Sequence, residues 1–431
     1  MDRGASAWSG PLLGTAAVIG GLTVLGSGAA RGQAAKSFKA ALIGCGGRGG
    51  GAIRNIIDAG KEVGVGIRVV ALADPYPERS RRVRGALKKV GQDVPEAQCF
   101  GGFDGYKKVM DTDAEIVLMA TPPAFRPAHF EAAVAAGKHV FVEKPVAVDP
   151  AGCRRMFAAG ELAAKKGLAV LAGTCLRHNQ GYAAMRKLVA DGAIGTPRAG
   201  NVYYCTGRLW FRRRAEGWSD AEYLVRNWVS FAEMSGDHIV EQHVHTIDMF
   251  NWVVGAHPVA AAAFGGRHRR QTGNQFDFFS IDYEYPDRVY MQSGSRQING
   301  CWSWGNGIHV VGEKGWANIR GGVQLWDGSK VPAPDLSLHR NMYVQEHIVL
   351  LKSLVDGKPI NDAKNVTEAT LTAIMGRIAA YTGKRVEWRH LVDPGAKSPL
   401  YELAYTPGPE AFETGDVKAP PDDVVPVPGK G

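Results

Sequence analysis

The sequence predicts an α/β protein with two domains: a doubly wound parallel sheet, then an α/β domain on a large, open, mostly antiparallel sheet. Short apolar runs alternate with helical segments in the first part of the chain, whereas apolar and polar residues alternate along extended segments in the second. A chain of 431 residues exceeds one ordinary hydrophobic core, so two domains are expected. The composition, 45% hydrophobic and 22% charged, is typical of a soluble globular protein.

The first domain is predicted from short runs of Val, Ile, Leu and Ala that are separated by helices. Continuous apolar runs are typical of strands covered on both faces, as in a parallel sheet. The predicted strands are 39–43, 67–73, 114–121, 139–142 and 168–173. The predicted helices cover 79–90 and 149–166, and two more begin near Gly49 and after Pro127.

A glycine-rich turn closes the first strand and opens the first helix. Gly44 permits a tight turn, Gly46 lets the backbone approach a pyrophosphate, and Gly49 lets the helix pack closely on the strand. The second strand ends at Asp74, where a carboxylate would accept the ribose hydroxyls and repel a 2′-phosphate. This order predicts an N-terminal Rossmann domain over residues 37–165 that prefers NAD to NADP. The predicted cofactor-binding residues of the turn are Gly44, Cys45, Gly46, Gly47, Arg48 and Gly49.

Two further strand ends carry candidate residues. Glu143-Lys144-Pro145 follows the strand 139–142, at the edge where open α/β sheets bind their ligands. Pro145 restrains the backbone, so the Lys144 ammonium can be aimed at a substrate hydroxyl as a donor or proton relay. An exposed loop lysine is the alternative. Lys144 is thus predicted as catalytic, and the predicted pocket also includes Glu143, Lys144, Thr121 and Pro122.

The second domain, predicted over residues 166–400, follows from a change of pattern after about Gly181. Alternating apolar and polar residues predict antiparallel strands with one covered face. The predicted strands are 198–206, 258–264, 276–285, 289–295, 308–311 and 316–319, with helices over 241–254, 343–356 and 366–382. The proline-rich tail, 407–431, is expected to be disordered.

The segment 236–248 gathers three histidines and several acids. On a helix, Glu241 and His245 share one face because they lie four residues apart. When a hydride leaves a carbinol carbon the hydroxyl proton must also leave, and a histidine is suited to accept it. His245 is therefore the predicted base, whereas His243 must point elsewhere and is expected to be structural. The predicted substrate-binding residues are Glu241, His238, Asp237 and Arg177. The spacing matches no zinc signature, so no metal is predicted.

The start of the chain differs in kind from the rest. Residues 11–30 form an uncharged stretch rich in Gly, Ala, Leu and Val. The stretch predicts a secretory leader over residues 1–35 and export to the periplasm or the extracellular space. An uncleaved membrane anchor is the alternative, and the many glycines make it the weaker one.

Charge, cysteine content and tryptophan content indicate which classes of binding partner are expected. The formal net charge is +9, but no nucleic-acid motif accompanies the arginine clusters, so a solvated basic surface is expected. The six cysteines are far apart and predict neither a disulfide framework nor a zinc site. Eight of the ten tryptophans lie between Trp210 and Trp326, which suits a carbohydrate ligand, although core packing explains most such residues equally well.

Taken together, the glycine turn, Asp74, Glu143-Lys144-Pro145 and His245-Thr246-Ile247-Asp248 resemble the Gfo/Idh/MocA oxidoreductases, over roughly residues 37–384. The resemblance implies a Rossmann domain followed by a domain with an open antiparallel sheet that often forms the subunit contact, hence a homodimer or homotetramer. It also implies NAD-dependent oxidation or reduction of sugars, polyols or their derivatives, with Lys144 and His245 at the reacting carbon.

Two positions depart from the family pattern. Glu241 stands where an aspartate is common, and Asp237-His238 stand where small residues are usual. With the form of the glycine turn, these changes are similar to an exported branch that includes NAD-dependent α-N-acetylgalactosaminidases. The resemblance thus leaves a redox-neutral glycosidase as an alternative, and a nucleotide- or sugar-binding protein without turnover as a second. An exported enzyme meets little free nicotinamide, so a tightly retained cofactor is expected.

Overall fold

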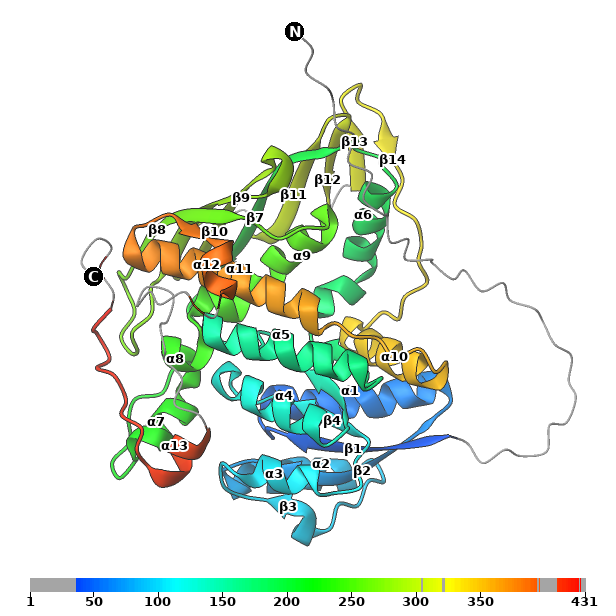
Figure 1. Cartoon of the computed structure of the whole chain (residues 1–431), viewed down its shortest axis with the longest axis vertical. Coiled ribbons are helices and arrows are strands. Elements are labelled where there is room, and N and C mark those ends of the chain that lie inside the picture. The colour runs from blue at the N-terminus through cyan, green and yellow to red at the C-terminus, as the bar shows by residue number, and fades with distance from the viewer. Residues whose placement is uncertain are drawn as a thin grey trace, which may run out of the picture. The chain divides into compact units, whose positions relative to one another are not determined.

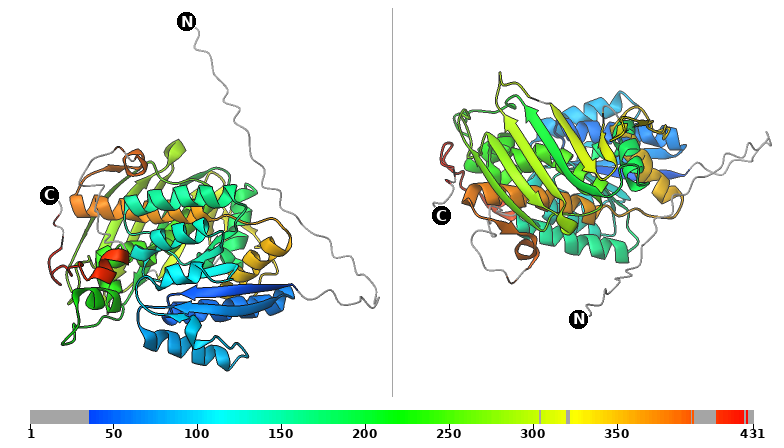
Figure 2. Two further views of the ribbon diagram at one scale, coloured as in Figure 1. Left: turned by 60° about the horizontal axis from the view of Figure 1, so that its bottom comes forward. Right: turned by 90° about the horizontal axis from the view of Figure 1, so that it is seen from above.

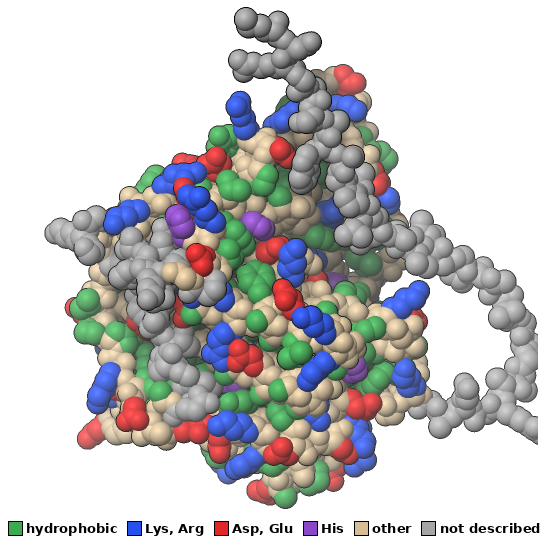
Figure 3. All heavy atoms as spheres, in the orientation of Figure 1, with side chains coloured by type: hydrophobic (Ala, Val, Ile, Leu, Met, Phe, Trp, Pro, Cys, Tyr) green, Lys and Arg blue, Asp and Glu red, His purple; other side chains and the backbone are tan. Residues whose placement is uncertain are grey.

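The computed structural model of the chain describes residues 36–303, 305–319, 322–393, 395, 409–425 and 427 (Figure 1). The leader predicted for residues 1–35 lies outside this range. From Lys36 onward the chain forms one compact unit. Within the described residues, no helix combines the length and the apolar character that a membrane span requires. On the face shown in Figure 3, Lys and Arg side chains alternate with Asp and Glu rather than gather into one patch.

The first domain contains a parallel sheet of six strands in the order β3-β2-β1-β4-β5-β6. Its strands are β1 Ser37–Ile43, β2 Gly66–Ala73, β3 Cys99–Phe100, β4 Ile116–Met119, β5 His139–Val142 and β6 Val170–Ala172. The strand order reverses between β1 and β4, and ligands of such sheets bind at the carboxyl edge there. The predicted doubly wound parallel sheet is confirmed.

Helices cover both faces of this sheet. Leu42 of β1 packs on one side with α1, α2 and α10, and Ile43 packs on the other with α3, α4 and α5, as the two-residue period of a strand requires. The bounds are α1 Gly47–Val63, α2 Pro77–Lys88, α3 Gly105–Met110, α4 Arg126–Ala135, α5 Pro150–Lys165 and α10 Met342–Val355. The chain thus returns to the first domain late in its course.

The second domain contains a nine-stranded sheet in the order β14-β13-β12-β11-β7-β10-β9-β8-β15. All neighbouring pairs are antiparallel except β7 and β10, which confirms the predicted mostly antiparallel sheet. The bounds are β7 Pro197–Thr206, β8 Ala260–Gly266, β9 Phe278–Glu284, β10 Tyr290–Gln297, β11 Asn306–Gly312, β12 Gly315–Asn318, β13 Gly322–Leu325, β14 Lys330–Val331 and β15 Val386–Glu387.

One face of the second sheet packs on helices, and the other lies on the outside (Figure 2). The covering helices are α6 Gln180–Ala190, α9 Val244–Val254, α11 Ala363–Thr382 and α12 Trp388–Val392. Helix α11 is buried along nearly its whole length because it lies between α5 of the first domain and this sheet. Two shorter helices, α7 Asp220–Arg226 and α8 Ala232–Ser235, lie beside the junction of the domains.

The structure corrects two expectations about organisation. The parallel sheet continues past the predicted boundary at residue 165, because β6 pairs with β5. The tail predicted as disordered over 407–431 contains helix α13, Pro409–Thr414, and both Phe412 and Val417 are buried. Composition predicted disorder there because it averages over the tail and does not report the contacts that bury single side chains.

Candidate active site

The glycine turn between β1 and α1 has the backbone that a dinucleotide requires. Gly44 has a φ of +93°, and a Cβ there would lie 2.7 Å from the carbonyl carbon of Ala120. A Cβ on Gly49 would lie 1.9 Å from the Gly44 oxygen, so only glycine lets α1 begin this close to β1. A Cβ on Gly46 would meet nothing within 4 Å. The Gly46 backbone therefore faces open space at the amino end of α1, where a pyrophosphate fits.

Asp74 is buried beside this turn, at the end of β2. Its Oδ2 accepts a hydrogen bond from the Cys45 amide at 2.8 Å, and its Oδ1 accepts one from the Tyr76 amide at 2.9 Å. Each oxygen keeps a lone pair for a further donor, such as a ribose hydroxyl. Burial raises the pKa of this carboxyl, although the amide hydrogen bonds and the Arg79 charge offset part of the rise.

A hollow, called the dinucleotide hollow, lies beside Asp74 and the glycine turn. Thr121 and Pro122, which follow β4, line it. The Thr121 hydroxyl lies 3.2 Å from Nδ1 of His129, and burial lowers the pKa of His129 to about 3, so this ring is neutral. Apolar and aromatic side chains complete much of the wall: Phe103, Tyr106, Phe125, Val225 and Trp228.

Arg48 ties the glycine turn to two buried carboxylates. Its guanidinium pairs with Glu143 at the end of β5 and, at 3.2 Å, with Glu346 of α10. It also lies 4.5 Å from the centre of the Tyr343 ring. Burial and the Glu143 charge raise the pKa of Glu346 well above its ordinary value. The Arg48 and Glu143 side chains therefore bind one another.

Lys144 reaches from the end of β5 to the second domain. Its Nζ donates hydrogen bonds to the backbone carbonyl of Glu241 and, at 3.2 Å, to the Glu241 carboxylate. Both side chains stay partly open, with 11% and 15% of their surfaces exposed. Glu241 belongs to a π-helical turn, Ile239–His243, that runs directly into α9. Such turns are frequent at functional sites.

His245 lies in the first turn of α9, beside the same ion pair. Burial lowers its pKa well below the ordinary value, and the Lys144 and Arg48 charges lower it further. The half-buried ring lies 6.2 Å, centre to centre, from the Tyr204 ring of β7. The imidazole is therefore neutral at physiological pH and able to accept a proton. The structure thus brings together Lys144, Glu241 and His245, three of the residues singled out in the sequence.

Two family models match the chain in succession. Residues 38–174 match the model described as an oxidoreductase family with an NAD-binding Rossmann fold, and residues 182–318 match the GFO/IDH/MocA C-terminal domain. Together they cover more than half of the chain. The chain belongs to the Gfo/Idh/MocA oxidoreductase family.

Similar proteins within this family include dehydrogenases of small polyols. An inositol 2-dehydrogenase from Burkholderia lata is 26% identical over 325 residues, which are 73% of this chain and 84% of the relative. An aldose-aldose oxidoreductase from Caulobacter crescentus, solved with glycerol, has a TM-score of 0.64 and 22% identity, covering 82% of this chain and 100% of that one. An oxidoreductase from Agrobacterium radiobacter, solved with NAD+, L-tartaric acid and magnesium, has a TM-score of 0.61 and 18% identity, covering 81% and 98%. The two solved structures share the fold.

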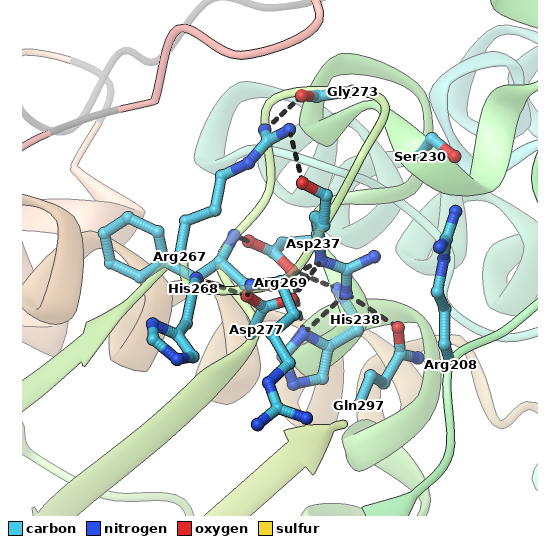
Figure 4. Close-up of polar contacts among 12 residues, drawn as sticks. Arg208, Ser230, Asp237, His238, Arg267, His268, Arg269, Gly273, Asp277 and Gln297 are labelled. Carbon is cyan, nitrogen blue, oxygen red and sulfur yellow. Dashed lines mark hydrogen bonds and ion pairs between the residues drawn. The ribbon is translucent and has the colours of Figure 1, made fainter. Parts of the chain in front are cut away.

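Asp237 and His238, predicted to bind substrate, instead belong to the interior of this Gfo/Idh/MocA protein (Figure 4). Asp237 accepts hydrogen bonds from the Phe276 amide, at 3.0 Å, and from the Tyr381 hydroxyl. His238 lies 3.1 Å from the Asp237 carboxylate and 3.3 Å from the Ser295 hydroxyl. Asp237 has a φ of 75°, so the chain turns just before the π-helical turn and directs both side chains inward. Sequence proximity to Glu241 did not reveal this change of direction.

Arg177, also predicted to bind substrate, forms an ion pair within the protein. Its Nε and Nη2 donate to the two oxygens of the Asp248 carboxylate of α9, at 2.9 and 2.7 Å. This bidentate pair is buried and holds the segment after β6 to the second domain. His243 bonds the Ser293 hydroxyl at 2.6 Å and the Thr246 hydroxyl at 2.9 Å, in keeping with its expected structural place.

Several contacts around the site were not foreseen. Gln297 of β10 donates to the Gln242 side chain at 2.7 Å and accepts from Arg270 at 2.7 Å, so it links the polar network of Figure 4 to the turn that carries Glu241. Glu346 pairs with Arg48, which lies 298 residues earlier in the chain, and no local sequence pattern predicts such a pair. Among the described residues, no three His, Cys, Asp or Glu side chains are grouped so as to hold a metal ion.

Proposed function

We propose that this protein is an NAD-dependent oxidoreductase that transfers a hydride between the nicotinamide and a hydroxyl-bearing carbon of a sugar, cyclitol or sugar derivative. The contact between Lys144 and Glu241, beside a neutral His245, carries the proposal. It lies at the carboxyl end of β5, on the same sheet edge as the glycine turn. NAD, when bound, supplies the hydride acceptor or donor.

Each of the three residues has a chemical role at the substrate. His245 takes the hydroxyl proton as the carbinol is oxidised, and returns it in the reverse direction. The Lys144 ammonium donates a hydrogen bond to the reacting oxygen and stabilises negative charge there. Glu241 holds Lys144 in place through both its carbonyl and its carboxylate, and the carboxylate accepts hydrogen bonds from neighbouring substrate hydroxyls.

The preference for NAD over NADP is supported by Asp74, which lines the dinucleotide hollow. A carboxylate there accepts both ribose hydroxyls and repels a 2′-phosphate. Two observations support the substrate class. The site offers a proton acceptor and a hydrogen-bond donor for a carbinol, and the similar proteins include an inositol 2-dehydrogenase and an aldose-aldose oxidoreductase.

One experiment tests the proposal. The protein is incubated with polyols, cyclitols and free sugars, with and without added NAD, and nicotinamide reduction is followed by absorbance. Reduction that depends on the carbinol supports the dehydrogenase. Aryl glycosides serve as the comparison, because release of the aglycone without net reduction would replace the dehydrogenase by a redox-neutral glycosidase. If the protein binds NAD but turns over none of these compounds, it is a sensor rather than an enzyme.

A homodimer or homotetramer through the uncovered face of the second sheet is part of the proposal. Phe264, Phe278 and Tyr290 are exposed on β8, β9 and β10. The register places all three on one face, because Phe264 pairs with Ser280 and Tyr290 with Glu284, both an even number of residues from Phe278. Exposed aromatic side chains on one sheet face suit contact with a second copy.

Export remains a proposal that rests on the sequence. The uncharged stretch 11–30 supports a leader, and a mature protein lacking it is expected outside the cytoplasm. Cell fractionation with amino-terminal sequencing of the mature protein tests this. A full-length amino terminus in the cytoplasmic fraction would contradict it.

A further inference from the structure

Residues 409–425, near the end of the chain, pack against residues that line the dinucleotide hollow and are called the C-terminal strap. Phe412 of α13 is 3% exposed. Its ring lies 5.3 Å, centre to centre, from Phe103 and 4.9 Å, edge-on, from Phe125. Phe103 and Phe125 both line the hollow, and they come from the loops after β3 and β4. The first anchor of the strap therefore packs directly behind the wall that a dinucleotide would touch.

A second anchor lies at Asp422. Its carboxylate accepts hydrogen bonds from the Tyr223 hydroxyl at 2.9 Å and from the Gly273 amide at 2.8 Å. Its backbone carbonyl accepts one from Arg267 at 2.7 Å. Burial and the hydrogen bond to Asp422 raise the pKa of Tyr223 to about 12, so this hydroxyl remains a donor throughout the neutral range.

The second anchor also reaches the wall of the hollow. Tyr223 lies in α7, and two residues later the same helix carries Val225, which lines the hollow together with Trp228. The strap thus contacts both sides of the hollow: the loops of the first domain through Phe412, and α7 through Asp422.

These contacts form one small hydrophobic cluster separate from the cores of the two sheets. Its members come from three stretches that are far apart in the sequence: Ala124, Phe125, Val148, Ala221, Tyr223, Leu224, Val225, Phe231, Met234, Phe412 and Val417. Opening the hollow by moving α7 away from the Phe103 and Phe125 loops would therefore pull this cluster apart and expose apolar surface to water.

We propose that the C-terminal strap holds the wall of the dinucleotide hollow closed and thereby keeps the bound nicotinamide cofactor on the protein between turnovers. This rests on the proposed function, in which a nicotinamide dinucleotide occupies the hollow. None of the strap residues lines the hollow. The strap acts on the rate at which the cofactor leaves, through Phe103, Phe125 and α7, and not through contacts with the cofactor.

A retained cofactor has a consequence for the reaction. The hydride removed from one carbinol carbon must be delivered to a carbonyl carbon in the same site before the next cycle begins. One carbinol is then oxidised for each carbonyl reduced, and the proton taken up by His245 returns to the new hydroxyl. A carbonyl compound, such as an aldose, is therefore the class of second substrate, unless the first substrate itself is reduced again.

The test measures release of NAD from the full-length protein. Radiolabelled NAD is bound, excess unlabelled NAD is added, and the label remaining on the protein is followed with time. Phe412→Ala and Asp422→Ala are compared with Asp423→Ala, which removes a neighbouring exposed carboxylate for which the structure shows no hydrogen bond. Release is expected to be about tenfold faster or more in the first two variants and unchanged in the third.

Thermal unfolding of the NAD-free proteins separates retention from simple stabilisation. Faster release from variants that still unfold near the wild-type temperature supports the strap as a closure. Unchanged release in both Phe412→Ala and Asp422→Ala overturns it, whether or not the unfolding temperature falls, because a merely structural strap would move only that temperature. A wild-type protein that binds no NAD would instead overturn the proposed function, so the two failures are distinguishable.

Discussion

Lys144 and His245 are coupled through charge as well as through position. The ammonium lies close enough to lower the pKa of the imidazole, and its hydrogen bonds to Glu241 fix it in that place. A positive neighbour disfavours the imidazolium, so it widens the pH range in which His245 can act as a base. Under the proposed function, the residue that binds the reacting oxygen therefore also keeps His245 in the neutral form that accepts a proton.

Lys144→Met tests this coupling directly. Removing the ammonium should raise the pKa of His245 toward its ordinary value, because one of the two charges that lower it is lost. The variant is expected to lose turnover by about a hundredfold or more while it still binds NAD. NMR titration of the histidine rings measures the pKa, and His309 of β11 should titrate as in the wild type. A His245 titration that does not move would contradict the coupling.

Asp74→Asn tests the choice of cofactor. Each Asp74 oxygen already accepts one backbone amide, and the asparagine keeps one of these acceptors while it removes the negative charge. The affinity for NAD should fall by about tenfold, since hydrogen bonds to a charged group are the stronger ones. The affinity for NADP should fall less or rise, because the repulsion of a 2′-phosphate disappears. Calorimetry with both cofactors measures the ratio of the NAD and NADP affinities. An unchanged ratio would contradict the assignment of Asp74 to the ribose site.

The residues that sequence could assign are those placed by a regular element. Lys144 follows a buried strand and His245 lies on a helix face, so their positions follow from strand and helix geometry. Arg177 could not be assigned in this way, because its partner Asp248 lies 71 residues further along the chain. The burial of Asp237 and His238 does not follow from the sequence pattern either, because no regular element predicts the positive φ at Asp237, just before the π-helical turn.

At the level of elements, the helix α10 has the widest effect on the site. It was predicted as a helix from its sequence, but its docking against α1 depends on apolar contacts between residues that are far apart in the chain. That docking buries Glu346 beside Glu143, with Arg48 as the cation that both carboxylates share. Two anions thus face one cation in the interior, which favours the protonated form of Glu346.

Glu346→Gln should therefore stabilise the protein at neutral pH, because the amide mimics the protonated carboxyl. The folded-state pKa of Glu346 is raised, so the wild-type free energy of unfolding falls as pH rises from about 4.5 toward that higher value. The advantage of the variant is expected to be absent at pH 4 and to reach about 2 °C or more in unfolding temperature at pH 8. Thermal unfolding at both pH values measures it, with the exposed Glu62→Gln as the matched control. An equal difference at both pH values would contradict the raised pKa.

For the whole molecule, the two sheets differ in how fully the chain covers them. The parallel sheet is covered by helices on both faces, and its continuous apolar strands predict this coverage from the sequence. The antiparallel sheet is covered on one face, and alternation predicts that too, but alternation does not predict that exposed aromatic side chains lie on the outer face. The register of β8, β9 and β10 places Phe264, Phe278 and Tyr290 on the same face.

This outer face supports the final prediction, that the protein associates through it. Phe264 and Tyr290 are 65% and 54% exposed, so replacing both with glutamate should cost the monomer little while it places charges in the contact. The wild type is expected to have the mass of a dimer or tetramer by light scattering, and Phe264→Glu/Tyr290→Glu that of a smaller species. Val90→Glu changes an equally exposed apolar residue on the first domain and should leave the mass unchanged. A double variant with the wild-type mass would place the subunit contact elsewhere on the molecule.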